Sequence, residues 1–221
     1  MKEILVIGAS GGIGSALSKA LEARGTRVTG LSRSVDGLDV TDEASVDRHL
    51  GALERTFDGI LVTTGALEID GAEPEKTIKA VTARAMADQF AVNAIGPALI
   101  LRHAQRLLPR EGRSVMAVLT ARVGSIGDNR IGGWTSYRAA KAAANQIVHT
   151  TAIELARTHA EAICVALHPG TVATPFTEKY LGRHPSVPPD EAAQNMLAVL
   201  DGLTAEDTGG FFDWAGKRVV W

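Results

Sequence analysis

An apolar run followed directly by a glycine-rich loop is the feature that most restricts the fold of this chain. Residues 4–7 read Ile-Leu-Val-Ile, the unbroken apolar pattern of a parallel strand covered on both faces. Gly8, Gly12 and Gly14 follow, and residues 13–24 carry apolar side chains at helical spacing. Glycines between a strand and a helix let the backbone approach a pyrophosphate that rests against the helix N-terminus. The segment predicts a nucleotide-binding unit; a tight turn without a ligand is the alternative reading of the glycines alone.

The remainder of the chain continues the alternation of strands and helices. We expect further strands at residues 27–31, 60–63, 114–119, 163–167 and 210–214, and further helices at residues 42–55, 77–108, 135–159 and 190–203. The long segment 77–108 is expected to break around residues 93–97, because Pro97 disrupts the helical ladder. This alternation predicts an α/β fold with a single Rossmann-type, doubly wound parallel sheet and helices on both faces. We expect one domain spanning residues 1–221.

Composition narrows the classes of function. With 23 basic and 25 acidic side chains the net charge is −2, which argues against a nucleic-acid surface. No apolar stretch approaches the ~20 residues of a membrane helix, and the opening is too short for a signal peptide. Cys164 is the single cysteine and lies in an apolar run, where a buried structural thiol is expected. We therefore expect a cytoplasmic protein that binds neither nucleic acid nor membrane.

Three residues near the middle of the chain carry an acid–base pattern. Tyr137 and Lys141 stand four residues apart in an expected helix, so that the phenol and the ammonium share one face. A cation beside a phenol favours the phenolate and lowers its pKa from its usual value near ~10. Ser125, twelve positions before the tyrosine, supplies a hydroxyl that can hold a carbonyl oxygen. An exposed helix pair and an ordinary turn serine are the structural alternatives.

The candidate residues converge on one edge of the expected sheet. Gly8, Gly65, Ser125 and Pro169 each follow the end of an expected strand. Ligands of doubly wound sheets bind outside the carboxyl ends of the strands. The order of the elements therefore predicts a single site.

With these motifs in this order, the chain resembles the short-chain dehydrogenase/reductase family over nearly its whole length. The glycine pattern, the Tyr-x-x-x-Lys pair and the serine match, as do Asn93 in the helical segment and Pro169-Gly170 with Thr174 beyond it. The stretch 120–137 and the segment Gly-Phe-Phe-Asp-Trp are more narrowly similar to the C-factor-like branch, which includes an intercellular developmental signal protein.

The resemblance implies hydride transfer between a nicotinamide and a small-molecule carbonyl or alcohol. The catalytic residues it implies are Ser125, Tyr137, Lys141 and Asn93, with the asparagine holding a water beside the lysine. The cofactor-binding residues it implies are Gly8, Ser10, Gly12, Ile13, Gly14, Arg33, Asp39, Val40, Thr64, Gly65, Tyr137, Lys141, Pro169, Gly170, Val172 and Thr174. No metal is implied, and a homodimer or homotetramer is expected because the family helix matching residues 135–159 commonly packs across a twofold axis.

The end of the second expected strand indicates the cofactor. A carboxylate there would suit the ribose of NAD(H), whereas Ser32 and Arg33 suit the 2′-phosphate of NADP(H). We therefore predict NADP(H), with NAD(H) possible, since Arg33 as a solvated loop cation is the alternative. Asp39 and Val40 resemble the family's adenine-contacting pair, although a structural role at the start of the next helix is equally open.

The chain also departs from the family pattern. The usual Asn-Asn-Ala-Gly reads Val62-Thr63-Thr64-Gly65 here, and His168 replaces the asparagine often found before Pro-Gly. Residues 175–189, with four prolines, are the expected lid on the substrate side. An NADPH-dependent carbonyl reductase is the expected function, and an NADP(H)-binding signalling or regulatory protein with incidental turnover is the alternative.

Overall fold

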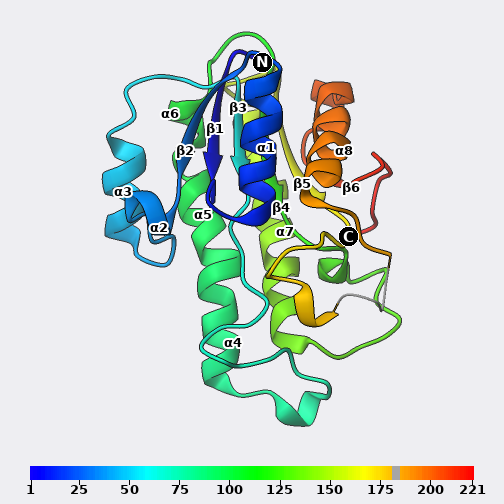
Figure 1. The fold of residues 1–221 in the computed structure, drawn as a ribbon. Helices are drawn as coiled ribbons and strands as arrows, with labels where there is room; N and C mark the ends of the chain where they lie inside the picture. The colour runs from blue at the N-terminus through cyan, green and yellow to red at the C-terminus, as the bar shows by residue number, and fades with distance from the viewer. Residues whose placement is uncertain (181–184) are drawn as a thin grey trace.

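Six parallel strands form one sheet in the order β2-β1-β3-β4-β5-β6 (Figure 1). The computed structural model describes residues 1–180 and 185–221. The strands are β1 Glu3–Ile7, β2 Arg27–Leu31, β3 Gly59–Val62, β4 Ser114–Leu119, β5 Ala162–His168 and β6 Phe211–Asp213. All six expected strands are present, and the last is shorter than expected because the chain turns after Asp213. The predicted doubly wound parallel sheet is confirmed.

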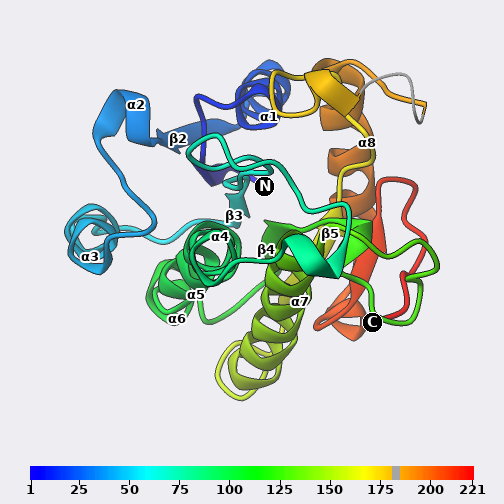
Figure 2. The same ribbon diagram turned by 90° about the horizontal axis from the view of Figure 1, so that it is seen from below.

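Helices cover both faces of this sheet (Figure 2). On one face α1 (Gly12–Ala23) and α8 (Pro189–Gly202) enclose a core that includes Val6, Leu17 and Met196. On the other face α3 (Glu43–Gly51), α5 (Gly96–Leu101), α6 (Ala104–Leu107) and α7 (Thr135–Leu155) enclose a second core. Alternate residues of each central strand enter opposite cores, because successive side chains of a strand point to opposite faces. This pattern explains why the central strands β1, β3, β4 and β5 are mostly apolar on both faces.

The segment expected to be one broken helix is divided further than predicted. A 3₁₀ turn at Ile78–Ala80 precedes α4 (Ala83–Phe90), and a π-helical turn at Ala91–Ile95 joins α4 to α5. Pro97 lies in the first turn of α5, directly after the π-turn, and the backbone stays helical through it. The expected change at residues 93–97 is therefore a π-turn within a continuous helical path.

Other helix boundaries also differ from expectation. The expected helix 42–55 ends at Gly51, and α7 ends at Leu155 rather than at residue 159. A short helix, α2 (Arg33–Asp36), follows β2 and was not predicted, since four residues carry no helical periodicity. Further 3₁₀ turns occupy Arg122–Gly124, Glu178–Tyr180 and Ala205–Asp207.

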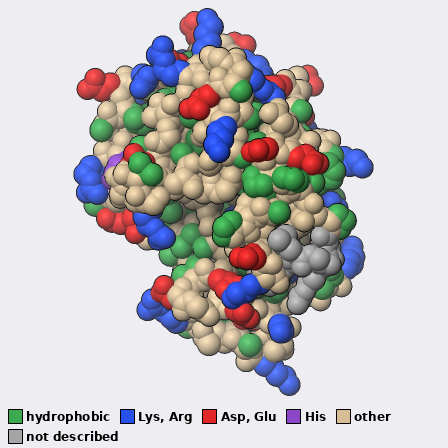
Figure 3. Space-filling model, viewed as in Figure 1, with side chains coloured by type: hydrophobic (Ala, Val, Ile, Leu, Met, Phe, Trp, Pro, Cys, Tyr) green, Lys and Arg blue, Asp and Glu red, His purple; other side chains and the backbone are tan. Residues whose placement is uncertain are grey.

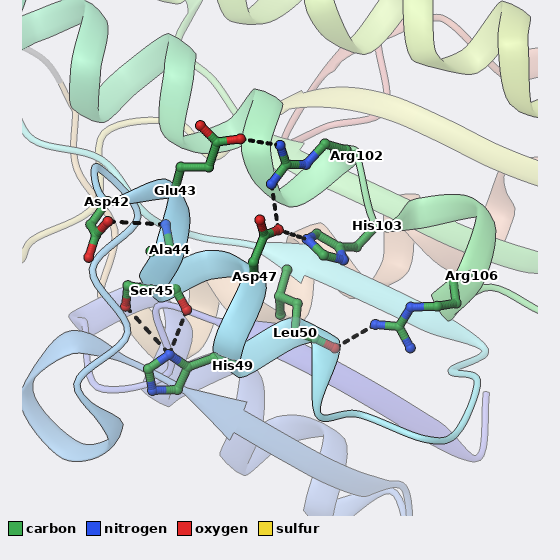
Figure 4. Close-up of polar contacts among 10 residues, drawn as sticks. All are labelled: Asp42, Glu43, Ala44, Ser45, Asp47, His49, Leu50, Arg102, His103 and Arg106. Carbon is green, nitrogen blue, oxygen red and sulfur yellow. Dashed lines mark hydrogen bonds and ion pairs between the residues drawn. The ribbon is translucent and has the colours of Figure 1, made fainter.

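Ion pairs attach α3 to the helices beside it (Figure 4). Arg102 Nη1 lies 2.5 Å from Glu43 Oε1, and its other terminal nitrogen contacts Asp47. His103 Nε2 lies 3.0 Å from the same Asp47 carboxylate. Arg106 donates to the carbonyl of Leu50 at 2.5 Å, which satisfies a backbone acceptor at the end of α3. These contacts hold α3 against the segment that contains α5 and α6.

Acidic and basic side chains are interspersed on the face of the molecule drawn in Figure 3. In residues 1–180 and 185–221, none of the helices is both long enough and apolar enough to cross a membrane.

Candidate active site

The start of α7 brings Tyr137 and Lys141 into one buried site. Tyr137 is 5% exposed and Lys141 3%, and the ammonium nitrogen lies 5.8 Å from the centre of the phenol ring. Lys141 Nζ also donates to the carbonyl oxygen of Leu119, the last residue of β4, at 3.2 Å. The two side chains lie on one face of α7, as expected from their spacing. Because both are buried, they are not an exposed helix pair.

The electrostatics of the pair differ from the expectation drawn from spacing. Burial raises the pKa of Tyr137 above its ordinary value and lowers the pKa of Lys141 to about 8. Both shifts have one cause, because the low-dielectric interior disfavours the charged form of each group. The expected lowering of the Tyr137 pKa by the lysine is therefore wrong for the protein in this state. Both side chains are buried, and with a pKa of about 8 the lysine is still mostly protonated at neutral pH.

Asn93 lies within the π-helical turn and faces the same site. Its Nδ2 donates to the Ala66 carbonyl at 2.8 Å and to Gln89 Oε1 at 2.7 Å, while its Oδ1 accepts the Ala66 N–H at 3.1 Å. A Cβ added to Gly65 would lie 3.1 Å from Asn93 Oδ1 and 3.3 Å from Lys141 Nζ. Asn93 thus clamps the loop after β3, and its side-chain oxygen and the lysine nitrogen both approach Gly65. Single π-turns of this kind are frequent at functional sites.

Ser125 is buried in the loop after β4. Its hydroxyl donates to the carbonyl oxygen of Val220 at 2.5 Å and accepts the Asp128 N–H at 3.0 Å. Residues 220 and 221 therefore contact the loop that carries Ser125. The Trp221 carbonyl accepts a hydrogen bond from the Gly127 N–H at 2.7 Å. Trp221 itself stacks on Phe211 of β6 with 5.6 Å between the ring centres. In this arrangement the single proton of the serine hydroxyl is directed at Val220.

The glycine loop forms a close cradle at the start of α1. A Cβ on Gly8 would lie 2.6 Å from Thr63 Oγ1, and one on Gly14 would lie 2.2 Å from the Gly8 carbonyl. A Cβ on Gly12 would lie 2.6 Å from Thr174 Cγ2, so this loop meets the segment after β5. No side chain caps the first N–H groups of α1, which begins after Gly11. Because free N–H groups at a helix N-terminus attract an anion, the cradle fits a pyrophosphate.

The remaining expected residues around the cradle lie at the same edge. Thr64 Oγ1 is buried and has no hydrogen-bond partner, as is expected of a group that awaits a ligand. Ile13 packs beneath the loop, whereas Ser10 is exposed and accepts a hydrogen bond from Ser34 at 2.8 Å. Val172 is buried, and its carbonyl accepts the hydroxyl of Thr177.

Gly170 follows Pro169 with φ +80°, a left-handed conformation that favours glycine. A Cβ there would lie 3.0 Å from the Trp214 ring. The Pro-Gly element therefore brings the segment after β5 close to the turn after β6.

The end of β2 holds charges of both signs. Arg33 is exposed at the start of α2, beside the Ser10–Ser34 contact. Asp36 folds back from the end of α2, and its carboxylate accepts the Ser32 N–H at 2.8 Å and the Ser32 hydroxyl at 3.3 Å. The Asp36 carboxylate therefore lies at the end of β2, where Ser32 and Arg33 were the residues expected from the sequence.

Asp39 and Val40 make contacts within the turn that leads into α3. Asp39 Oδ1 accepts the N–H of Thr41 at 2.9 Å and its hydroxyl at 2.7 Å, and these bonds hold the pKa of Asp39 below its ordinary value. Val40 packs against Gly96 at the start of α5. Both residues support the turn into α3.

Comparison with known proteins identifies the family. The family model described as short chain dehydrogenase matches residues 2–183. The chain belongs to the short-chain dehydrogenase family. It is 31% identical over 236 aligned positions, covering 100% of both chains, to 1-hydroxy-2-glutathionyl-2-methyl-3-butene dehydrogenase of Rhodococcus sp. strain AD45. It is 37% identical over 139 positions, covering 62% of this chain and 78% of the relative, to C-signal of Myxococcus xanthus.

Among solved structures, this short-chain dehydrogenase resembles a carbonyl reductase from chicken fatty liver, determined with NADPH bound. The TM-score is 0.84 at 24% identity, covering 100% of this chain and 94% of the reductase. At that identity the likeness concerns the fold. The expected membership of an oxidoreductase family is confirmed.

Sequence reasoning missed three residues of this short-chain dehydrogenase site. Asp36 contacts Ser32 from the end of a short helix that was not predicted, whereas Glu75 and Val220 reach the site through contacts between distant parts of the chain. Glu75 and Val220 lie 61 and 95 positions from the serines that they contact.

The expected lid is only partly described, because residues 181–184 lie outside the described residues. Within the described part Lys179 pairs with Glu68 at 2.6 Å and with Glu73 at 3.2 Å. Across residues 1–180 and 185–221, no three His, Cys, Asp or Glu side chains are grouped so as to hold a metal ion.

Proposed function

We propose that this short-chain dehydrogenase is an NADP(H)-dependent oxidoreductase that interconverts a carbonyl and an alcohol, with Tyr137 as the acid–base group. The observation that carries the proposal is the buried pair of Tyr137 and Lys141 on one face of α7, beside the loop held by Asn93. A buried phenol beside a lysine suits proton transfer to a carbonyl oxygen. The carbonyl reductases of similar fold and the relatives named as dehydrogenases support the same reaction class.

The residues of the chain divide the proton chemistry between them. Tyr137 donates its proton to the carbonyl oxygen during reduction and removes it during oxidation. A neutral phenol, which burial favours here, is the form that reduction requires. Lys141 supplies the adjacent positive charge when protonated, which stabilises the phenolate left behind. Ser125 donates a hydrogen bond to the same oxygen once its hydroxyl leaves Val220.

The residues at the cradle fit a dinucleotide cofactor. Gly8, Gly12 and Gly14 leave space at the uncapped start of α1, and the unpartnered Thr64 hydroxyl faces the same edge. A cofactor bound there would supply or accept the hydride. Lys141 would also hold the nicotinamide ribose, and Thr174 with the Val172 backbone would hold the carboxamide. Arg33 would pair with the 2′-phosphate and so favour NADP(H) over NAD(H).

A second candidate function is a signalling or regulatory protein that binds NADP(H) with incidental turnover. The similarity to C-signal over 139 positions favours this reading. The two functions differ in what Tyr137 is needed for. A reductase requires the phenolic hydroxyl in every cycle, whereas a nucleotide-bound signal requires only the fold.

The test combines cofactor titration with turnover. Tryptophan fluorescence would measure the Kd of NADPH and NADH for the wild type and for Tyr137→Phe, and absorbance would follow oxidation across a panel of carbonyls. We expect Tyr137→Phe to bind NADPH within about twofold of wild type and to lose about 10²–10⁴-fold in kcat. Tight NADPH binding with turnover that does not depend on Tyr137 would support the signalling alternative. Binding of neither cofactor would refute both.

A further inference from the structure

Glu75 is a buried carboxylate that faces the start of the catalytic helix. It lies in the loop between β3 and α4, is 8% exposed, and lines a hollow together with Ser136 and Tyr137. Its Oε2 accepts the Ser136 N–H at 3.2 Å, and its Oε1 accepts the Ser136 hydroxyl. Burial alone would raise the pKa of this carboxyl, but the hydrogen bonds from Ser136 and from the backbone outweigh it and keep the pKa below its ordinary value. The group is therefore an anion in the resting protein.

The backbone that precedes α7 is strained, and Glu75 holds it. Gly132, Gly133 and Trp134 have consecutive positive φ values of +70°, +67° and +53°. Such a value is uncommon for a residue as bulky as tryptophan, and strained residues persist only where their surroundings fix them. The Glu75 carbonyl accepts the Trp134 N–H at 2.5 Å, and a Cβ on Gly133 would lie 3.5 Å from the same oxygen. Glu75 therefore contacts the turn through its backbone and the first helical turn through its side chain.

The helix has no other side-chain cap at this end. Trp134, in the N-cap position, has a left-handed conformation and makes no capping hydrogen bond. An acidic group at this place also interacts favourably with the N-terminal end of the helix dipole. Ser136, which receives both contacts, is the residue directly before Tyr137. Trp134 in turn packs edge-on against the Tyr137 ring, with 6.2 Å between ring centres.

We propose that Glu75 is a positioning residue that fixes the first turn of α7, and with it the phenol of Tyr137, by holding Trp134 and Ser136. The inference rests on the proposed function for its effect on turnover. Glu75 makes no hydrogen bond to Tyr137 or Lys141. It acts on the tyrosine through Trp134 and Ser136, which precede it in the chain.

The test uses Glu75→Gln, which keeps the size of the side chain. It removes the negative charge of the carboxylate that accepts the hydrogen bonds from the Ser136 N–H and hydroxyl. We expect kcat to fall about 10- to 100-fold, because small displacements of a catalytic group carry losses of that size. The Kd of NADPH should stay within about twofold. In the Tyr137→Phe background the same change should lower the residual rate less than about twofold, because its effect passes through the phenol.

Two further variants complete the design. Asp70→Asn removes an exposed carboxylate from the same loop and should leave kcat unchanged; its φ of +49° suits asparagine. Ser136→Ala removes one of the two hydrogen bonds from Ser136 to the Glu75 carboxylate, and it carries the same test if Glu75→Gln fails to fold. A kcat for Glu75→Gln equal to that of Asp70→Asn would overturn the proposal. So would a loss of equal size with and without the Tyr137 hydroxyl, because Glu75 would then act independently of the phenol.

Amide hydrogen exchange separates this proposal from the reductase proposal, since it needs no turnover. We expect faster exchange in Glu75→Gln confined to residues 134–138, and wild-type exchange in Asp70→Asn. That result in a protein that reduces none of the carbonyls would retain the positioning role and refute the reductase function. Unchanged exchange at residues 134–138 would refute the positioning role.

Discussion

Ser125 and Val220 are joined by a 2.5 Å hydrogen bond in which the serine hydroxyl donates to the backbone carbonyl near the end of the chain. The same hydroxyl accepts the Asp128 N–H, so both of its hydrogen-bonding roles are used within the protein. Tyr137 differs, because the shift of its pKa arises from burial alone, with no contribution from a hydrogen bond. The two residues should therefore respond differently to removal of their hydroxyls.

We predict that Ser125→Ala lowers both activity and stability. Loss of the hydroxyl leaves the Val220 carbonyl and the Asp128 N–H without their partner, at a cost of about 1–3 kcal/mol in the free energy of unfolding. Turnover should fall about 10²–10³-fold, as expected for one donor to a substrate oxygen. Tyr137→Phe should lower turnover while leaving the denaturant midpoint nearly unchanged. Equal stability of the wild type and Ser125→Ala would argue against the hydrogen bond to Val220.

Arg33 should control the choice between the two nicotinamide cofactors. Arg33→Ser removes a charge-assisted contact with a 2′-phosphate, so the Kd of NADPH should rise about 10- to 100-fold. The Kd of NADH should change less than about twofold. Arg27→Ser is the matched control, because Arg27 is an exposed arginine at the opposite end of β2. Fluorescence titration measures the Kd of NADPH and of NADH for both variants beside the wild type. A parallel loss of NADH affinity in Arg33→Ser would contradict a contact between Arg33 and the 2′-phosphate.

Asp36 should oppose Arg33 at the same place. Its carboxylate contacts Ser32 and would repel a nearby phosphate. Asp36→Asn keeps an acceptor for the Ser32 N–H and removes the charge. We expect the ratio of NADPH to NADH affinity to increase in this variant, by titration at low ionic strength. A ratio that does not change would place the 2′-phosphate away from this carboxylate.

The buried Lys141 should make the stability of the unliganded protein depend on pH. Its pKa is lowered to about 8 in the folded state, below the ordinary 10.5. Between pH 8 and 10.5 the unfolded chain binds more protons than the folded protein, so the free energy of unfolding rises with pH. Below pH 8 the lysine is protonated in both states, so the cost of burying its charge no longer changes with pH. Relative to Lys141→Met, the free energy of unfolding should rise by on the order of 1 kcal/mol per pH unit from pH 8 to 10. Urea denaturation would measure it, and parallel profiles for the two proteins would contradict a buried ammonium.

His168 should contribute to acid sensitivity. Burial, with the Arg122 cation adding and Asp213 opposing, lowers the pKa of His168 to about 4 from its ordinary 6.5. The unfolded chain therefore binds the proton first, and stability is lost as pH falls from about 6.5 to 4. His168→Asn removes the titrating group and should flatten the profile in that range. Thermal midpoints at pH 4.5, 5.5 and 6.5 would show it, and an unchanged slope would assign the acid sensitivity to other groups.

Local patterns predicted the sheet well because each strand carries its own apolar run. The segment 77–108 was harder to predict, since its apolar spacing is compatible with α, π and 3₁₀ turns alike. The π-turn at Ala91–Ile95 depends on Asn93 binding the loop after β3, a contact that the spacing does not contain. Similarly, the short α2 depends on the Asp36 carboxylate folding back on Ser32.

The order of strands and helices, the glycine cradle and the pairing of Tyr137 with Lys141 could all be predicted from the sequence, because they rest on periodicity and on contacts within a few residues. The contact of Glu75 with the start of α7 and the hydrogen bond from Ser125 to Val220 appear only in the folded chain, because they join distant residues. The tertiary structure also decided the electrostatics, because a lysine beside a phenol lowers the phenol pKa in water, whereas burial of both groups raises it here. Burial and distant contacts arise only when the chain closes on itself, so no local pattern encodes them.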